Sequence, residues 1–201
     1  MFELKNNIPF VFSQLDDKFI AATYRLCLGI EPNILQLDKA FNWRNIEGSG
    51  TSARYSNYNF FLIKDPIVKP IYDLIKSSYL EMLENLEKSR ESMFIQCWIN
   101  IHRQNQQLMK HAHPYPMHGH ITINTENTST IYGKYDELEI PNKNGMLTLL
   151  GKPDVLHYVT PYEKAQGARV SIAFDLLPES WINKNQRWKD RFDDRIFIPF
   201  D

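Results

Sequence analysis

All six histidines of this chain lie between positions 102 and 157, and five of them fall within the nineteen residues from 102 to 120. The cluster comprises His102, His111, His113, His118 and His120, and His157 follows alone. Neutral imidazole is the commonest side-chain ligand for metals, and it suits several transition metals. This concentration indicates a metal site that combines a close pair of histidines with a distant third ligand.

The spacing leaves two candidates for the close pair. Alternate residues of a β-strand point to the same face, so His111 and His113 can present two imidazoles to one ion. His118 and His120 satisfy the same rule, and spacing alone does not choose between the pairs. Because His157 is the only histidine beyond the cluster, it is the candidate for the third ligand.

A second chemical feature lies in the last predicted strand, 168–176. Arg169 and Ser171 alternate there with an apolar set and therefore share the opposite face. The apolar set is Val170, Ile172, Phe174 and Leu176. An arginine on the inner face of a small barrel is costly unless it meets an anion. A guanidinium beside a hydroxyl can hold a carboxylate through charge-assisted hydrogen bonds.

The second half of the chain has the pattern of a β-protein. Runs rich in β-branched and aromatic residues are separated by Gly, Pro and Asn turns, which predicts a sandwich or barrel. The predicted strands are 94–101, 118–124, 146–150, 155–159 and 168–176, and His111 to His113 is expected to be extended. The tail, 181–201, alternates aromatic and charged residues and is expected to lie as a strap across the surface.

The N-terminal half is expected to be mainly helical. Apolar residues recur every three or four positions after Ser13, the candidate N-cap, until Pro32 ends the run. A second helix is expected to begin at Asp65 and Pro66 and to continue to Leu86. Between the two helices, an irregular stretch from residue 41 is expected to lead into a strand at 57–63.

Composition places the chain among ordinary globular proteins. It has 201 residues, of which 43% are hydrophobic, and its net charge is −1, so there is no bulk electrostatic argument for a nucleic-acid or membrane partner. The two cysteines, Cys27 and Cys97, are expected to be buried free thiols. The N-terminus lacks the pattern of a signal peptide and no apolar run could span a bilayer, which predicts a cytoplasmic protein.

At this point the chain resembles a known family. A His-x-His pair, a Pro-x-x-x-Gly turn before an apolar strand, and a lone His followed by Arg-x-Ser look like the iron(II)/2-oxoglutarate-dependent oxygenase superfamily. More narrowly, the chain resembles a bacterial and phage branch of hydroxylase-like proteins whose first pair is often written His-x-His-Pro. The matching segments are 98–101, 111–114, 145–147, 157–161 and 169–174, within 93–178.

The resemblance implies an α+β fold in which a double-stranded β-helix, a jelly-roll or cupin-like barrel, is buttressed by N-terminal helices. We expect one domain over 1–201: helical support over 12–90, the β-helix over 93–178 and a C-terminal strap over 179–201. Iron(II) would be bound by His111, His113 and His157. Its co-substrate, 2-oxoglutarate, would be anchored by Arg169 and Ser171, and the reaction would be hydroxylation of a C–H bond.

One departure from the family concerns His113, because a carboxylate usually occupies that position. A three-histidine site is the first interpretation. The second is binding by His111 and His157 alone with an exogenous ligand, and the third is a shifted register with His118 or His120 as a ligand. Asp154, on a turn near His157, is badly placed to share the ion.

The remaining histidines have less specific expectations. His102 is expected to have a surface or structural hydrogen-bonding role. His118 and His120 suit a pocket-lining role and a plain sheet position equally well.

Two other functions fit the missing carboxylate. One is a cupin-like three-histidine metalloenzyme that needs no 2-oxoglutarate and uses Arg169 for its substrate. The other is a non-catalytic β-barrel binding module. The substrate of an oxygenase is open between small molecules and peptidyl side chains, and near-neutral charge argues against nucleic acid.

Overall fold

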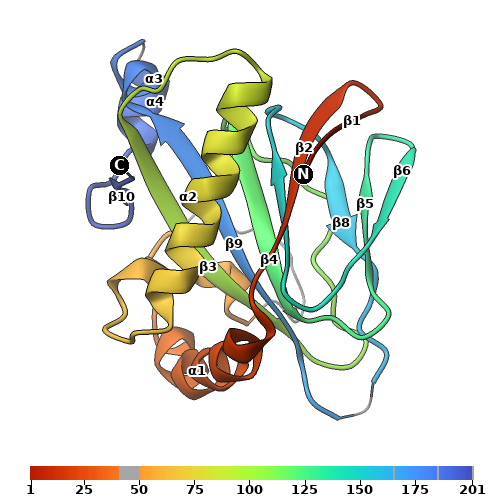
Figure 1. The fold of residues 1–201 in the computed structure, drawn as a ribbon. Coiled ribbons are helices and arrows are strands. Elements are labelled where there is room, and N and C mark those ends of the chain that lie inside the picture. The colour runs from red at the N-terminus through yellow and green to blue at the C-terminus, as the bar shows by residue number, and fades with distance from the viewer. Residues whose placement is uncertain (41–49, 165, 185, 201) are drawn as a thin grey trace.

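The computed structural model describes residues 1–40, 50–164, 166–184 and 186–200 (Figure 1). The helices are α1 (Asp17–Leu35), α2 (Val68–Asn85), α3 (Glu179–Lys184) and α4 (Gln186–Arg191), with short 3-10 turns η1 (Ser52–Arg54) and η2 (Phe60–Leu62). The strands are β1 (Phe2–Lys5), β2 (Ile8–Gln14), β3 (Met93–His102), β4 (Met117–Asn124), β5 (Ser129–Tyr132), β6 (Leu138–Pro141), β7 (Met146–Leu150), β8 (His157–Val159), β9 (Arg169–Pro178) and β10 (Ile198–Pro199).

The strands form two antiparallel sheets. The larger has seven strands in the order β1-β2-β7-β4-β9-β3-β10, and the smaller has three in the order β6-β5-β8. Strand β9 lies between β3 and β4, and its whole length pairs with β3 from Arg169 opposite His102 to Pro178 opposite Met93. The order is far from sequential, so most pairings join segments distant in the chain.

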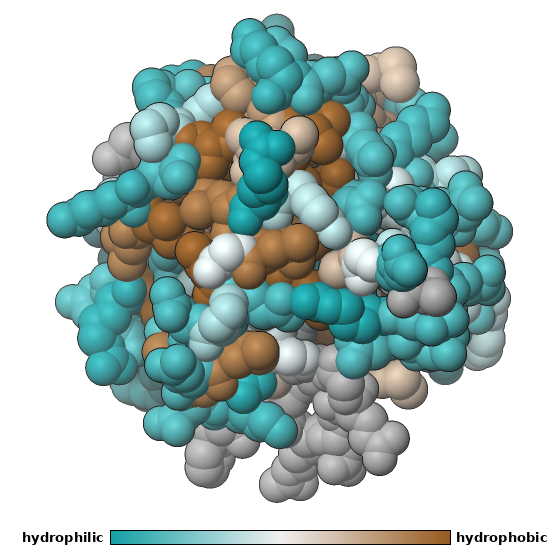
Figure 2. Space-filling model, turned by 90° about the horizontal axis from the view of Figure 1, so that it is seen from below, coloured by the Kyte–Doolittle hydropathy of each residue, from teal (hydrophilic) through white to brown (hydrophobic). Residues whose placement is uncertain are grey.

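The outer face of the larger sheet carries the main hydrophobic core. Helix α2 lies across this face (Figure 1), and its Ile71, Ile75 and Met82 are fully buried against it. The predicted apolar set of β9 belongs to this core, as do alternate residues of β3 and β4. Seen from below, a cluster of hydrophobic residues with a hydrophilic rim is visible at the end that carries α1, whose Phe19 and Leu28 are only partly buried (Figure 2).

The inner face of the larger sheet is polar where β9 and β4 form it. Strand β9 presents Arg169, Ser171 and Asp175 there, and all three side chains are buried. Strand β4 contributes His118 and His120, and the smaller sheet closes the space from the opposite side. The two faces of one sheet are therefore chemically different.

Five strands predicted from the sequence are confirmed with small shifts at their ends, namely β3, β4, β7, β8 and β9. Five were missed: β1 at one edge of the larger sheet and its neighbour β2, the short β5 and β6, and β10 at the opposite edge. The predicted strand at 57–63 is wrong, because Phe60 to Leu62 form a 3-10 turn capped by the Asn59 side chain. Residues 41–49 of the predicted irregular stretch lie outside the described residues.

The ends of α1 differ from the prediction. Ser13 belongs to β2 and pairs with Leu147, and the N-cap is Asp16, whose carboxylate accepts from the Lys18 amide. Pro32 does not end the helix, which continues to Leu35 with Ile34 buried. Burial of Ile34 holds the last turn although proline lacks one amide hydrogen bond.

The tail contains α3 and α4, followed by β10, which pairs with β3. Within the described part of the chain, no helix is both long and apolar enough to cross a bilayer.

Candidate metal centre

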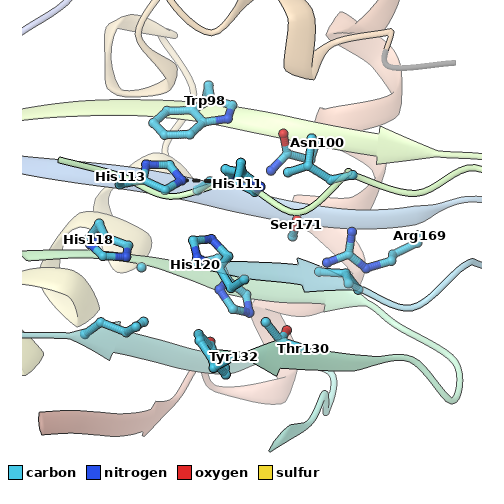
Figure 3. Close-up of a pocket in the computed structure, with 16 residues that line it drawn as sticks. Trp98, Asn100, His111, His113, His118, His120, Thr130, Tyr132, Arg169 and Ser171 are labelled. Carbon is cyan, nitrogen blue, oxygen red and sulfur yellow. Dashed lines mark hydrogen bonds between the residues drawn. The ribbon is translucent and has the colours of Figure 1, made fainter. Parts of the chain in front are cut away.

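The structure brings His111, His113 and His157 together. One ring nitrogen from each lies within 4.8 Å of the others, and no carboxylate belongs to this group among the described residues. His111 and His157 face each other through a pair of backbone hydrogen bonds, with N···O distances of 2.9 and 2.8 Å. His113 follows His111 by two residues, so its ring enters the same space, as Figure 3 shows.

Hydrogen bonds fix the tautomers of these rings. Nδ1 of His111 is 2.8 Å from the Met109 carbonyl oxygen. Nδ1 of His113 is 2.7 Å from an Asp175 carboxylate oxygen, and Nδ1 of His157 is 2.9 Å from the Val155 carbonyl oxygen. A carbonyl or a carboxylate only accepts, so each Nδ1 carries the proton, and a neutral ring then has a lone pair on Nε2. Nε2 of His111 is 3.1 Å from Nε2 of His113. Two such lone pairs repel unless a proton or a metal ion lies between them.

The environment keeps two of the rings neutral. Burial, together with the proximity of the His113 ring, lowers the pKa of His111 to about 3. Burial also holds the pKa of His157 well below its usual value, and the neighbouring histidines add to this. Deprotonated imidazole is the form that binds metal, so the free rings are ready for an ion at neutral pH.

His118 and His120 line the same cavity but are not part of the three-histidine group. The His118 ring stacks on His113 at 4.9 Å between centroids, and Trp98 stacks on His113 at 5.8 Å. Burial lowers the pKa of His118 far below its usual value and that of His120 to about 4. The pocket-lining expectation is therefore confirmed for both.

Arg169 and Ser171 lie farther along the cavity from His113 (Figure 3). Arg169 is 3% exposed, and burial lowers its pKa only to about 10, so it stays charged at neutral pH. Its Nη1 donates to Nδ1 of His102 at 3.2 Å. His102 is fully buried and not at the surface. The sequence predicted a structural hydrogen-bonding role for it but did not predict its partner.

The inner face of the larger sheet contains buried polar atoms that have no hydrogen-bond partner among the described residues. They include His102 Nε2, Thr122 Oγ1, Thr148 Oγ1 and Arg169 Nε. Because His102 accepts from Arg169 through Nδ1, its Nε2 carries a proton and is a free donor. An orphaned buried polar atom costs about 1–3 kcal/mol, so a polar ligand that bound these atoms would recover that free energy.

The cavity opens into a wider groove. The enclosed part has a volume of about 40 Å³, and the groove has about 550 Å³. Both share Trp98, Asn100, Leu108, His111 and His113. Aromatic side chains of Tyr55, Tyr115 and Phe197 line the groove, and Asp154 and Asp175 are the carboxylates that line it in the described part of the chain.

Sequence reasoning missed two functional candidates, namely Asp175 and His102. Asp175 carried a usable signal, since it continues the alternation of Arg169 and Ser171 on β9. His102 had no such signal, because strand pairing alone brings it to Arg169. Asp154, as expected, is outside the ligand group, and its amide donates to the His113 carbonyl.

Comparison with known proteins adds to this geometry. No protein-family model matches the sequence, and no curated protein matches it. Solved structures do match. A prolyl-4-hydroxylase from Pseudomonas putida is 12% identical, with a TM-score of 0.59 over 83% of this chain and 91% of that chain. The fold is that of the 2-oxoglutarate-dependent oxygenases.

Two further matches extend the comparison. A prolyl hydroxylase from Trichoplax adhaerens, in complex with a hypoxia-inducible-factor peptide fragment, is 9% identical, with a TM-score of 0.59 over 88% and 87% of the two chains. The α-ketoglutarate-dependent carbocyclase SnoK of nogalamycin biosynthesis is 10% identical, with a TM-score of 0.55 over 96% and 92%. At these identities the likeness concerns the fold, and it confirms the expected α+β double-stranded β-helix.

Proposed function

We propose that the protein is a non-haem iron(II)- and 2-oxoglutarate-dependent oxygenase. One observation carries the proposal: three imidazoles, each with Nδ1 engaged by an acceptor, direct their Nε2 atoms toward one point on this fold. Imidazole suits iron(II), and metal-bound histidines commonly donate their other N–H to a carbonyl or carboxylate. His111, His113 and His157 would hold the ion.

The residues of the cavity also fit the co-substrate. Arg169 is buried and charged without a carboxylate partner among the described residues, and Ser171 lies beside it on β9. A carboxylate is the group that a guanidinium and a neighbouring hydroxyl bind best. We therefore assign Arg169 and Ser171 to one carboxylate of 2-oxoglutarate. His102 holds the guanidinium and would offer its Nε2 proton to the same anion.

When bound together, iron(II) and 2-oxoglutarate supply the oxidising power for C–H hydroxylation by oxygen. The chain's own contribution is positioning and exclusion of water. The three histidines would leave other coordination positions open to the co-substrate and oxygen, and Trp98 and the smaller sheet would shield a bound ion from solvent.

The substrate would bind in the groove beside His111 and His113. Its walls combine aromatic rings, neutral polar groups and two carboxylates, and among the described residues no lysine or arginine lines it. This chemistry favours a neutral or cationic group, on a small molecule or a peptidyl side chain, and argues against a phosphate backbone. The peptide-bound Trichoplax hydroxylase supports a peptidyl substrate by analogy of fold.

We also propose a cytoplasmic location. Cys27 and Cys97 are both buried free thiols, as expected from the sequence, and this suits a reducing compartment.

Anaerobic titration with iron(II), with and without 2-oxoglutarate, tests the proposal. The weak visible charge-transfer band of the chelate should appear only when both are present. Arg169→Ala should weaken 2-oxoglutarate binding roughly tenfold to a hundredfold, the loss expected for hydrogen bonds to a charged group, while iron affinity stays unchanged. Equal 2-oxoglutarate affinity in the parent and the variant would contradict the assignment of Arg169.

A second function is favoured by two specific observations, the absence of a carboxylate from the ligand group and the small enclosed cavity. About 40 Å³ corresponds to roughly three water molecules, so a five-carbon dicarboxylate requires side chains at the inner end to move. A three-histidine metalloenzyme that binds its substrate's carboxylate through Arg169 would avoid this. Iron binding without a charge-transfer band, and oxygen consumption without succinate, would select this alternative.

A further inference from the structure

Asp175 is the buried carboxylate closest to the proposed ion, and its situation is unusual. It is 2% exposed, and its carboxylate accepts a hydrogen bond from Nδ1 of His113 at 2.7 Å. Among the described residues no lysine or arginine forms an ion pair with it. A buried carboxylate without a cation is expensive, which means that a compensating positive charge belongs nearby.

The three-histidine group, in contrast, lacks a negative charge. Three neutral imidazoles leave both positive charges of a divalent ion uncompensated, whereas the usual triad of this chemistry includes one carboxylate. The His113 ring lies between the carboxylate that lacks a cation and the site that lacks a negative charge. Its Nδ1 faces Asp175, and its Nε2 faces His111.

The strands place Asp175 to act through His113. It lies on β9, opposite His118 of β4 and Gln96 of β3. His118 and Trp98 lie on either side of the His113 ring (Figure 3), with interplanar angles of 12° and 16°. Side chains from three adjacent strands therefore hold this ring, and Asp175 is the one among them that hydrogen-bonds to it.

We propose that Asp175 is a positioning residue that supplies, across His113, the negative charge which a directly bound carboxylate would otherwise give to the ion. The inference rests on the proposed function. It explains how a site without a carboxylate ligand retains affinity for a divalent cation, and it assigns His113, the residue that departs from the family pattern, a specific role.

Anaerobic titrations with iron(II), and with cobalt(II) followed by its visible absorption, test this. Asp175→Asn keeps an oxygen that can accept from His113 Nδ1 but removes the charge, and should lower metal affinity about 10–100-fold, as for other groups that orient ligands. Asp175→Ala also removes the acceptor, so it should lower affinity further and alter the cobalt spectrum. Asp154→Asn is the matched control: the same charge is removed at the exposed rim of the same groove, and affinity should change less than about twofold.

A second pair of variants, built on His113→Asp, distinguishes an effect transmitted through the His113 ring from a general structural effect of Asp175. In His113→Asp the carboxylate is attached to the site directly, so adding Asp175→Asn should no longer weaken metal binding. An equal loss in both backgrounds, or parent affinity in Asp175→Asn, would overturn the inference while leaving the metal site intact. Failure of the parent itself to bind either ion would overturn the proposed function, and the inference with it.

Discussion

The two faces of the seven-stranded sheet are built on opposite principles. On β9, Val170, Ile172, Phe174 and Leu176 are fully buried against the helices and contribute apolar packing only. The alternate residues Arg169, Ser171 and Asp175 are equally buried but polar. Burying an apolar side chain contributes about 1.5–3 kcal/mol, whereas burying an unpartnered polar atom costs about 1–3 kcal/mol.

The outer face therefore stabilises the fold, whereas the inner face destabilises it. The outer face joins α1, α2 and the strands into one core, which can hold the inner face in a conformation that is costly by itself. Several polar atoms of the inner face have no hydrogen-bond partner in the part of the chain that the structure describes. A face of this kind is suited to bind a polar ligand, and changes to the two faces should therefore have opposite consequences.

Acidification should have the largest effect, and it should act through the inner face. Five buried histidines have lowered pKa values: His102, His111, His118, His120 and His157. The unfolded chain binds more protons than the folded one between about pH 3 and 6.5, so stability rises with pH in that window and levels off above it. For His111, whose pKa is about 3, lowering the pH from 7 to 5 should cost roughly 2 kcal/mol.

Urea unfolding of the metal-free protein at pH 7.5, 6 and 5 measures this dependence. A free energy of unfolding that stays constant over this range would show that the histidines are hydrated and not buried.

On the outer face, Phe174→Ala should lower the free energy of unfolding by about 3–5 kcal/mol, because it leaves a cavity in the core under α2. The inner face should respond little, so metal affinity of the folded fraction should stay near that of the parent. Urea denaturation and cobalt(II) titration give the two quantities. A loss below about 1 kcal/mol would mean that the sheet does not depend on this core.

His157→Ala should reverse that result. It removes a proposed ligand but leaves its backbone hydrogen bonds with His111, so metal affinity should fall more than about 100-fold, beyond the usual effect of a group that only orients a ligand. His120→Ala, a cavity histidine outside the ligand group, is the control and should retain affinity. Parent-like binding by His157→Ala would show that the site is misassigned.

Thr148→Val should have the smallest effect on the free energy of unfolding, and it should stabilise the protein. Its hydroxyl is buried and without a partner, and valine has a similar shape and suits a strand. The free energy of unfolding should rise by about 1 kcal/mol. Chemical denaturation of the two proteins decides this, and a clear decrease would reveal a hydrogen bond that the structure does not show.

The sequence by itself determined the elements with strong local patterns. Runs of β-branched and aromatic residues between turns located β3, β4, β7 and β9, and alternation along β9 placed Arg169 and Ser171 on a shared face. The i, i+2 rule selected two histidine pairs but could not choose between them. Short or edge strands such as β1 and β5 were missed because few residues carry their pattern, and sheet pairing stabilises them.

Only the tertiary structure decided which histidines meet. His111 and His113 reach His157 because the chain returns after 46 positions to pair with residue 111, a register that no local pattern encodes. The same folding brings His102 to Arg169 and Asp175 to His113. Residue types and alternation are properties of neighbours in sequence, whereas hydrogen-bond partners and ring tautomers depend on strand order, which hydrophobic packing of the whole chain determines.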